Sequence, residues 1–337
     1  MKISLITPAK KSSKNGNRTT ALRWARILRD LGHHVDITVT YDGQKADLMI
    51  ALHAWRSAAA ITTYRKLYPD QPLILALTGT DINEFIHSDP KPTLASMETA
   101  DALVCLHDLV VDVTPKKFRK KLNVIYQSAP ALSRKRKSTT KNFDICLIGH
   151  MRDVKDPLRG AMALRGVPES SKLRLIHLGK AHNKAWEKKG RAEMKRNPRY
   201  IWQGEKAGWE VRKELARTNL MLISSVSEGG ANVVSEALVA GVPVIASKIN
   251  GNVGMLGKDY PGYYPVGDEK ALRKLLLKCE SDAAFMRDLS RRCKVRAKLF
   301  KLAEEKRRWK KLLAEIVNSL THIRGSSKTE AGADVPR

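Results

Sequence analysis

The first part of the chain alternates short apolar runs with amphipathic stretches. Residues 2–7 form an apolar run, and the segment that follows repeats apolar residues at helical spacing from Ala21 until Gly32. The β-branched run Val35–Thr40 predicts the next strand. Strand, loop, helix and strand in this order form the unit of a parallel α/β sheet. Further strands are predicted at Leu48–Leu52, Leu73–Leu77, Ala102–Leu106 and Val124–Tyr126.

A second series of the same kind follows a polar stretch. Residues 132–142 lose apolar side chains and include the run Ser-Arg-Lys-Arg-Lys-Ser-Thr-Thr-Lys, which is typical of a linker between domains. The strands predicted beyond it are Asp144–Ile148, Leu173–Leu178, Tyr200–Trp202, Leu220–Ser224 and Val242–Ser247.

These patterns predict an α/β protein with two doubly wound halves facing across a cleft, where ligands of such sheets usually bind. We expect an N-terminal domain over residues 1–131 and a C-terminal domain over residues 143–296. A long basic helix with an apolar stripe is predicted over residues 297–324. The polar tail over residues 325–337 is expected to be disordered.

The charge of the chain is unusual. Its 62 Lys and Arg against 34 Asp and Glu give a net charge of +28, which attracts phosphorylated ligands, nucleic acid or an anionic membrane surface without choosing among them. Much of the excess lies in the runs Arg134–Lys137, Lys188–Arg196 and Arg291–Arg308, which also fit solvated loops and helix faces.

The sequence offers no sign of membrane, metal or redox chemistry. No stretch approaches the roughly 20 apolar residues of a membrane-spanning helix, and the run Ile3–Ile6 is too short for the core of a signal peptide. No Asp-x-Asp, Cys-x-x-Cys or other metal-ligand cluster occurs, so neither a metal nor a cofactor is predicted. The widely spaced cysteines favour a reducing cytoplasm; they are Cys105, Cys146, Cys279 and Cys293.

The most informative stretch is a glycine-rich turn from a buried strand into a helix. Glu228 precedes Gly229 and Gly230, and Glu236 shares a helix face with Asn232. The glycines let backbone N–H groups approach a ligand, and the helix N-terminus favours an anion. Because a carboxylate accepts hydrogen bonds from vicinal hydroxyls, the two glutamates suit a sugar and a ribose.

The segment Ser227–Ala237, followed by Gly241–Ser247, resembles the E-x7-E signature of the family-4 glycosyltransferases, whose GT-B fold has two Rossmann-like domains. The resemblance implies that Glu228 contacts the transferred sugar and that Glu236 binds the ribose of the nucleotide. It also implies that the intervening backbone amides bind sugar and phosphate. The matching donor-binding positions are Gly229, Gly230, Ala231, Asn232 and Val233.

The family also carries an Arg and a Lys for the diphosphate in a pattern like G-R-x4-K. In the matching stretch Gly149–Lys155, Lys155 corresponds to the Lys, whereas His150 stands where the Arg is expected and Arg152 is a candidate for the missing charge. Fixed cations lower the barrier because a diphosphate leaving group accumulates charge. We therefore predict that Arg152, Lys155 and Glu228 are catalytic and that His150 binds the donor, although both cations also fit ordinary loop positions.

A closer resemblance covers the chain up to about residue 300. The stretches that carry it are Met1–Pro8, Asn15–Arg18, Leu52–Ala54, Thr78–Asp81, Ile125–Pro130, Gly149–Pro157, Ile249–Gly257 and Asp259–Tyr263. They resemble the selenosugar synthases of selenoneine biosynthesis. This resemblance implies a reaction of a UDP-sugar, UDP-glucose or UDP-N-acetylglucosamine, with selenophosphate to give a 1-selenosugar, UDP and phosphate.

The acceptor is expected on the N-terminal domain. Gly16, Asn17 and Arg18 form a glycine turn that opens a helix, which predicts a second anion-binding site suited to selenophosphate. Many relatives have His at the position of Thr78, so that no His role carries over, and Asp81 also fits a helix N-cap. Further acceptor-binding candidates near strand ends are His53, Arg56, Thr78, Thr80 and Asp81.

Two alternatives remain open. A hexosyltransferase acting on lipid or polysaccharide precursors has the same fold, and its basic segments would bind an anionic membrane surface peripherally. A nucleic-acid-binding protein is suggested by the charge alone and lacks a recognisable motif, so we expect no nucleic-acid partner. The stereochemistry is also open, because family-4 enzymes usually retain the anomeric configuration whereas the selenosugar resemblance implies inversion.

Overall fold

The structure, a computed structural model, describes residues 1–13 and 16–330 and divides into two compact units. One unit comprises Met1–Tyr126 together with the chain from Ala303 onward, and the other comprises Gln127–Leu302. The division after Tyr126 precedes the predicted domain end at residue 131. The C-terminal helix, expected as a separate element, belongs to the first unit.

The first unit is built on a parallel sheet with the strand order β2-β1-β3-β4-β5-β6. Its central strands β3 and β4 are buried throughout and read as continuous apolar runs, because helices cover both faces of the sheet. The strands are β1 (Lys2–Ile6), β2 (His34–Thr38), β3 (Leu48–Leu52), β4 (Leu73–Leu77), β5 (Ala102–Cys105) and β6 (Leu122–Val124).

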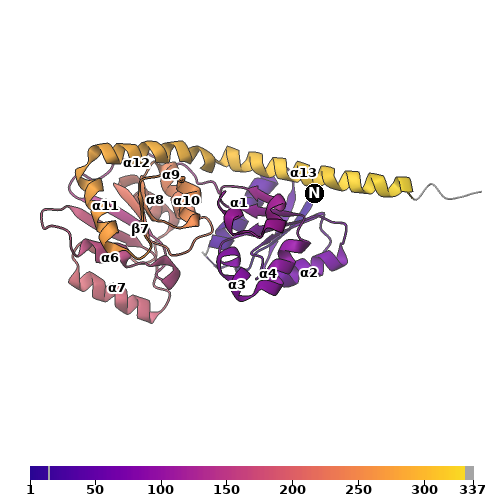
Figure 1. Ribbon diagram of the computed structural model, residues 1–337, viewed down its shortest axis with the longest axis horizontal. Helices are drawn as coiled ribbons and strands as arrows, with labels where there is room; N and C mark the ends of the chain where they lie inside the picture. Colours follow the sequence, from indigo (N-terminus) through magenta and orange to yellow (C-terminus); the bar gives the residue numbers. More distant parts are fainter. Residues whose placement is uncertain (14–15, 331–337) are drawn as a thin grey trace, which may run out of the picture. The chain divides into compact units, whose positions relative to one another are not determined.

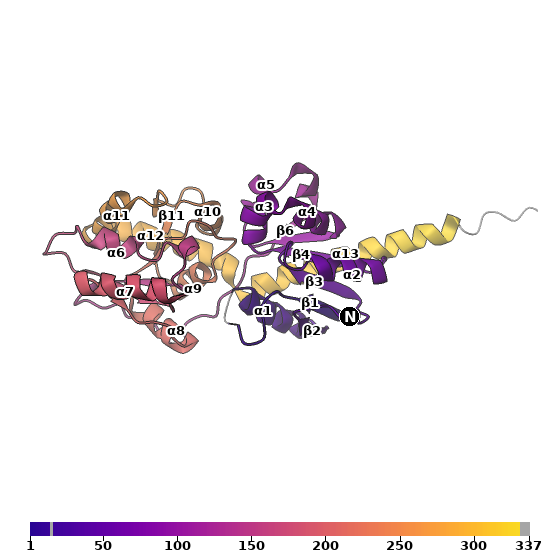
Figure 2. The ribbon, with the colours of Figure 1, turned by 90° about the horizontal axis from the view of Figure 1, so that it is seen from below.

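The helices α1 and α13 share one hydrophobic core on one face of this sheet, and the core on the other face involves α2 and α4 (Figures 1 and 2). The Trp24 ring packs edge-on against Trp309 with 4.9 Å between centroids, and Trp24 Nε1 donates to Glu305 Oε1 over 2.8 Å. The bounds are α1 (Gly16–Asp30), α2 (Ala58–Leu67), η1 (Asp81–Phe85), α3 (Ile86–Ser88), α4 (Pro90–Thr99), α5 (Val110–Val113), η2 (Lys116–Lys121) and α13 (Leu302–Glu330).

The C-terminal helix differs from its predicted bounds at both ends. A short 3-10 turn, η4 (Ala297–Phe300), and an extended Lys301 precede it, so that the helix begins at Leu302 and not at residue 297. It continues to Glu330, beyond the predicted end at residue 324 and into the segment expected to be disordered. Residues 331–337 of the predicted tail lie outside the described residues.

The second unit has a parallel sheet with the order β12-β11-β10-β7-β8-β9. Its strands are β7 (Phe143–Ile148), β8 (Leu173–Leu178), β9 (Tyr200–Trp202), β10 (Leu220–Ile223), β11 (Val244–Ser247) and β12 (Tyr263–Tyr264). Its helices are η3 (Asp153–Lys155), α6 (Arg159–Leu164), α7 (Lys184–Arg196), α8 (Gly208–Arg217), α9 (Asn232–Ala240), α10 (Asn250–Leu256), α11 (Glu269–Ser281) and α12 (Ala283–Arg296).

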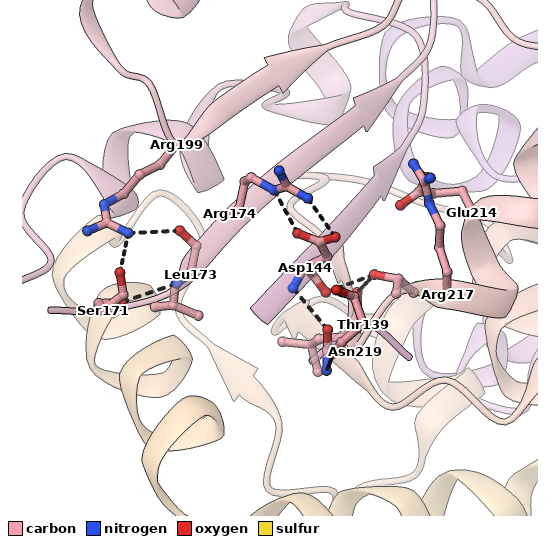
Figure 3. A network of polar contacts seen from close by, with 11 residues as sticks. Thr139, Asp144, Ser171, Leu173, Arg174, Arg199, Glu214, Arg217 and Asn219 are labelled. Carbon is pink, nitrogen blue, oxygen red and sulfur yellow. Dashed lines mark hydrogen bonds and ion pairs between the residues drawn. The ribbon is translucent and has the colours of Figure 1, made fainter. Parts of the chain in front are cut away.

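The predicted linker is docked on the second unit. The Arg136 guanidinium donates to the carbonyl oxygens of Gly241 (2.7 Å) and Thr218 (2.5 Å), and Thr139 N donates to Arg217 O. At the start of β7, the Asp144 carboxylate accepts two hydrogen bonds from the Arg174 guanidinium, at 2.8 and 2.9 Å (Figure 3). Part of the basic run Arg134–Lys137 is therefore structural and not a solvated face.

Both sheets confirm the predicted doubly wound α/β architecture. In the first sheet the strand order reverses direction between β1 and β3, and in the second it reverses between β7 and β10. Ligands of such sheets bind beyond the carboxyl ends of the strands at this switch point. The predicted site residues follow these strands: the glycine turn of α1 follows β1, His53 follows β3, Lys155 follows β7 and Glu228 follows β10.

Candidate active site

The loop after β7 carries the cations predicted to bind the diphosphate. Its backbone runs beside the segment that follows β8, because Gly149 N donates to Leu178 O over 2.8 Å and Met151 N donates to Lys180 O over 2.9 Å. The loop ends in the 3-10 turn η3, whose last residue is Lys155. This turn places the Lys155 backbone next to β10.

The loop after β10 turns sharply into α9. Gly230 has φ = 142°, a conformation that residues with a Cβ rarely adopt, and α9 begins at Asn232 without a side-chain cap. The loop is bonded to the β7 loop, since Val226 N donates to Val154 O and Ser224 Oγ donates to Lys155 O over 3.0 Å. The two loops thus meet at the switch point.

Lys155 and Glu228 form an ion pair where these loops meet. The Lys155 Nζ contacts Glu228 Oε1, and the two side chains are only 21% and 10% exposed. Ser225 Oγ donates to the same carboxylate oxygen over 2.6 Å. Two of the three predicted catalytic residues therefore lie in direct contact. The third, Arg152, is exposed on the β7 loop.

A buried network of hydrogen bonds supports the loop that carries Glu228. Asn252 Nδ2 donates to Ser247 O and Oγ, at 2.9 and 3.1 Å, and Ser247 Oγ donates to Ser225 O over 2.5 Å. Helix α10 contacts the Glu228 backbone so closely that a Cβ on Gly251 would lie 2.3 Å from Glu228 O. Sequence reasoning missed Ser225, Ser247 and Asn252, although Asn252 lies within the Asn-Gly-Asn run that begins α10.

His150 adds a neutral donor to the site and no charge. Burial lowers the pKa of His150, and the cations Lys180, Arg152 and Lys155 lower it further against the opposing Glu205 carboxylate. Lys180 N donates to His150 Nδ1 over 3.1 Å, so the proton of the neutral ring lies on Nε2. The positive field of the site comes from Arg152 and Lys155 together with Lys180, which the sequence did not single out.

The start of α9 holds the remaining donor-binding candidates. Ala231 is buried, whereas Asn232, Val233 and Glu236 are half-buried. Glu236 lies one helical turn after Asn232 on α9, the helix that follows the Glu228 loop. The first amides of a helix lack intrahelical acceptors, which makes this end suitable for a phosphate or sugar oxygen. The individual roles of these residues stay predictions.

In the first unit, His53 and Thr80 lie in hydrogen-bond contact. His53 is buried with φ = 77°, and its Nε2 lies 3.0 Å from Thr80 Oγ1. Arg56 N donates to His53 Nδ1 over 3.2 Å, which leaves the ring proton on Nε2. Burial lowers the pKa of His53, with an added contribution from Arg56 against the opposing Asp81, so the ring is neutral. The exposed Thr80 hydroxyl thus accepts from His53 and retains its own proton for another acceptor.

Asp81 is fully buried and organises this loop. Its carboxylate accepts hydrogen bonds from the backbone N–H groups of Ala54, Thr78, Gly79 and Ile82, at 2.8–3.1 Å. Asp81 is the first residue of η1 and not the N-cap considered from the sequence, which is Thr80. Its side chain therefore fixes the segment around Thr80 and has no exposed surface for a ligand.

The other acceptor candidates lie near the ends of β1 and β3. Gly16 is the exposed first residue of α1, and Asn17 and Arg18 are half-buried in its first turn; residues 14–15 lie outside the described residues. The Arg56 guanidinium lies 5.9 Å from the centre of the Phe85 ring.

An aromatic pair next to these candidates was not predicted. The Trp55 ring stacks on Phe85, with 4.2 Å between centroids and 4° between planes. No sequence signal links the two residues, since their contact depends on the packing of η1 beside the β3 loop. Within residues 1–13 and 16–330, no three His, Cys, Asp or Glu side chains are grouped to hold a metal ion. No helix in the described part of the chain is long and apolar enough to cross a membrane.

Comparisons with known proteins identify the family and the fold. The family model described as Glycosyl transferases group 1 matches residues 128–299, which include Lys155, Glu228 and Glu236. The solved structure of HepE from Anabaena in complex with UDP has a TM-score of 0.76 at 15% identity, covering 94% of this chain and 100% of that chain. HepE in complex with UDP-glucose gives a TM-score of 0.74 at 16% identity, with the same coverage.

Sucrose-phosphate synthase from Thermosynechococcus elongatus has a TM-score of 0.77 at 15% identity, covering 94% of this chain and 99% of that chain. At such identities the likeness concerns the fold. Together with the two parallel sheets and the C-terminal helix, it confirms the predicted GT-B fold.

Proposed function

The chain belongs to the group 1 glycosyl transferases, and we propose that it transfers the sugar of a UDP-sugar to selenophosphate, giving a 1-selenosugar, UDP and phosphate. The observation that carries the donor half of this proposal is the ion pair between Lys155 and Glu228 in front of the Gly229-Gly230 turn. The acceptor half is supported by the resemblance of the sequence to the selenosugar synthases.

In the proposed donor site, four groups of the protein bind different parts of a UDP-sugar. Glu228 binds the hydroxyls of the transferred sugar, the amides at the start of α9 bind the adjoining phosphate, and Glu236 binds the ribose. Lys155 and Arg152 compensate the charge of the diphosphate as it leaves. The complexes of HepE with UDP and UDP-glucose support a uridine nucleotide as the donor, because that protein has the same fold.

The proposed reaction needs no base on the acceptor side. The selenium of selenophosphate is anionic, and it attacks the anomeric carbon as the bond from that carbon to the UDP oxygen breaks. UDP leaves with the bonding electron pair. Water then cleaves the phosphorus–selenium bond, which releases phosphate and the 1-selenosugar. The buried neutral His53 ring donates to Thr80. This arrangement suits a role in orienting the Thr80 hydroxyl as a hydrogen-bond donor better than a role in removing a proton from the acceptor.

The test is to incubate the purified full chain with selenophosphate and either UDP-glucose or UDP-N-acetylglucosamine, and to follow UDP release together with the isotope pattern of selenium in the product by mass spectrometry. We expect a 1-selenosugar in equal amount to UDP, and little product from the Lys155→Ala variant. A parallel reaction contains lipid and polysaccharide extracts as hydroxyl acceptors. Transfer to a hydroxyl acceptor with none to selenophosphate would contradict the proposal and favour the hexosyltransferase.

A further inference from the structure

A buried polar chain links Tyr200 on β9 and His177 on β8 to Gly149 on the β7 loop. Tyr200 Oη lies 2.8 Å from His177 Nδ1, and His177 Nε2 lies 2.9 Å from Gly149 O. His177 is 0% exposed and Tyr200 is 2% exposed, so water does not compete for these contacts. Neither side chain takes part in the proposed transfer, and neither was predicted from the sequence.

The partners of His177 fix the position of its proton. A carbonyl oxygen accepts hydrogen bonds only, so the proton lies on Nε2 and is donated to Gly149 O. The Tyr200 hydroxyl then donates to Nδ1. Burial lowers the pKa of His177 to about 4, which keeps the ring neutral at physiological pH. The chain therefore has one direction, from the tyrosine hydroxyl through the imidazole to the carbonyl.

The peptide that accepts this hydrogen bond is held tightly on its other sides. A Cβ on Gly179 would lie 1.9 Å from Gly149 O, so this peptide rests directly on the backbone of Gly179, whose φ is 154°. Trp202 Nε1 donates to Gly179 O over 2.7 Å and holds that backbone in place. Because a trans peptide is planar, fixing the Gly149 carbonyl also directs the His150 N–H to the opposite side.

We infer that His177, oriented by Tyr200, is a positioning residue for the nucleotide diphosphate. It fixes the start of the loop that carries His150, Arg152 and Lys155, while the ion pair with Glu228 fixes the end of the loop. A displacement of about 1 Å in such a loop is enough to reduce a rate about a hundredfold. The inference rests on the proposed UDP-sugar donor.

Substitutions distinguish a positioning role of His177 from a role that is limited to filling the core. His177→Met keeps an unbranched side chain of similar size without a donor, whereas the amide of His177→Gln reaches the same carbonyl with an N–H group. Tyr200→Phe removes only the hydroxyl that orients the imidazole. Leu175→Ala is the matched control, because Leu175 is also fully buried on β8 but its side chain faces Gly160 on α6.

The experiment measures the dissociation constants of UDP and of uridine for the full chain and each variant, together with the melting temperature. We expect His177→Met to weaken UDP binding about 10- to 100-fold, and Tyr200→Phe to weaken it about 3- to 10-fold, each with uridine affinity within about twofold of wild type. We expect His177→Gln to recover most of the UDP affinity. Leu175→Ala is expected to lower the melting temperature without changing the ratio of the two affinities.

Equal loss of UDP and uridine affinity in the His177 and Tyr200 variants, or no loss in either, would overturn the inference. If His177→Met does not fold, the comparison of Tyr200→Phe with Leu175→Ala decides. A wild-type chain that binds no UDP would overturn the proposed function itself, which separates that outcome from a failure of the positioning role.

Discussion

Lys155 Nζ and Glu228 Oε1 are in direct contact, although 73 residues separate them along the chain. Their loops follow β7 and β10, which are neighbours in the sheet, so the topology brings a cation and a carboxylate together at the switch point. The ion pair also keeps the Lys155 ammonium beside the glycine turn, where a sugar phosphate would bind. The two residues were predicted from separate motifs, and their contact supports a single donor site.

Lys155→Ala is expected to lower kcat by about 100- to 1,000-fold and to change KM for the UDP-sugar much less. In the proposed function the ammonium stabilises charge that develops on the diphosphate as it leaves, and loss of such a group affects the transition state most. The measurement is the steady-state rate of UDP release. Lys172→Ala, which removes an exposed lysine of the same unit, serves as the control and is expected to match wild type.

The pair also makes a double-mutant prediction. Glu228→Gln combined with Lys155→Ala is expected to be little slower than the slower single variant, because residues in direct contact act as a unit. Fully additive losses would show that the two side chains act independently. A Lys155→Ala enzyme with wild-type kcat would place the diphosphate elsewhere.

Glu236→Ala is expected to weaken UDP binding about 10- to 100-fold without unfolding the second unit. A charge-assisted hydrogen bond to the ribose contributes about 1.5–3 kcal/mol, and the half-buried side chain lies on the surface of α9. Isothermal titration calorimetry with UDP measures the effect. Glu187→Ala removes a carboxylate of α7 whose side chain is 44% exposed and paired with Arg191, and it is expected to leave UDP affinity unchanged. Unchanged UDP affinity in Glu236→Ala contradicts the assignment.

The strands of this fold are readable from the sequence because most of them are buried on both faces. β3, β4, β8 and β9 have the predicted bounds. For β3 and β4 the reason is clear, since a continuous apolar run marks a central parallel strand. The predicted start of α13 was wrong because the apolar periodicity continues through the 3-10 turn. The break at Lys301 is a backbone feature without a Gly or Pro to mark it.

Candidate site residues could be predicted only where they lie in short local motifs. Glu228, the glycines and Glu236 form one contiguous motif, whereas Asn252 and His177 act through hydrogen bonds that exist only after distant strands have paired. Single residues of this kind carry no local signal. Arg136 illustrates the same limit, since a lysine- and arginine-rich stretch gives no indication of which guanidinium is used structurally.

Acid is expected to destabilise both units, because each contains a buried neutral histidine. Burial lowers the pKa of His107 and of His177 from 6.5 to about 4. Between pH 4 and 6.5 the unfolded chain therefore binds more protons than the folded chain. The contribution of these histidines to the free energy of unfolding is greatest above pH 6.5 and falls as the pH decreases towards 4. Each histidine contributes on the order of 3 kcal/mol to this loss.

Calorimetric unfolding at a series of pH values measures this dependence. His177→Gln, in which the new side chain does not titrate, is expected to reduce this pH dependence for the second unit alone, and His107→Gln is expected to reduce it for the first unit, where His53 still titrates. Identical pH dependence in wild type and both variants would contradict the assignment.

Asp81→Asn is expected to destabilise the first unit by about 2–4 kcal/mol, because the buried carboxylate accepts from four backbone N–H groups and an amide nitrogen would face some of them. Thermal unfolding measures the loss. Asp112→Asn, on an exposed position of α5, is the control and is expected to change little. A wild-type melting temperature for Asp81→Asn would show that the loop around Thr80 does not depend on this carboxylate.

Arg18→Ala is expected to raise KM for selenophosphate about 10- to 100-fold while KM for the UDP-sugar stays within about twofold. Two phosphorylated anions must approach each other in the proposed reaction, and two unit charges 4 Å apart repel by roughly 4 kcal/mol at an effective dielectric constant near 20. Arg18 lies in the first turn of α1, where the positive end of the helix dipole adds to its charge. Arg26→Ala removes an exposed arginine farther along the same helix and keeps the net charge change equal. If Arg18→Ala raises both KM values equally, or if Arg26→Ala has the same effect, the arginine acts through the overall field of the +28 chain and not through a selenophosphate site at the start of α1.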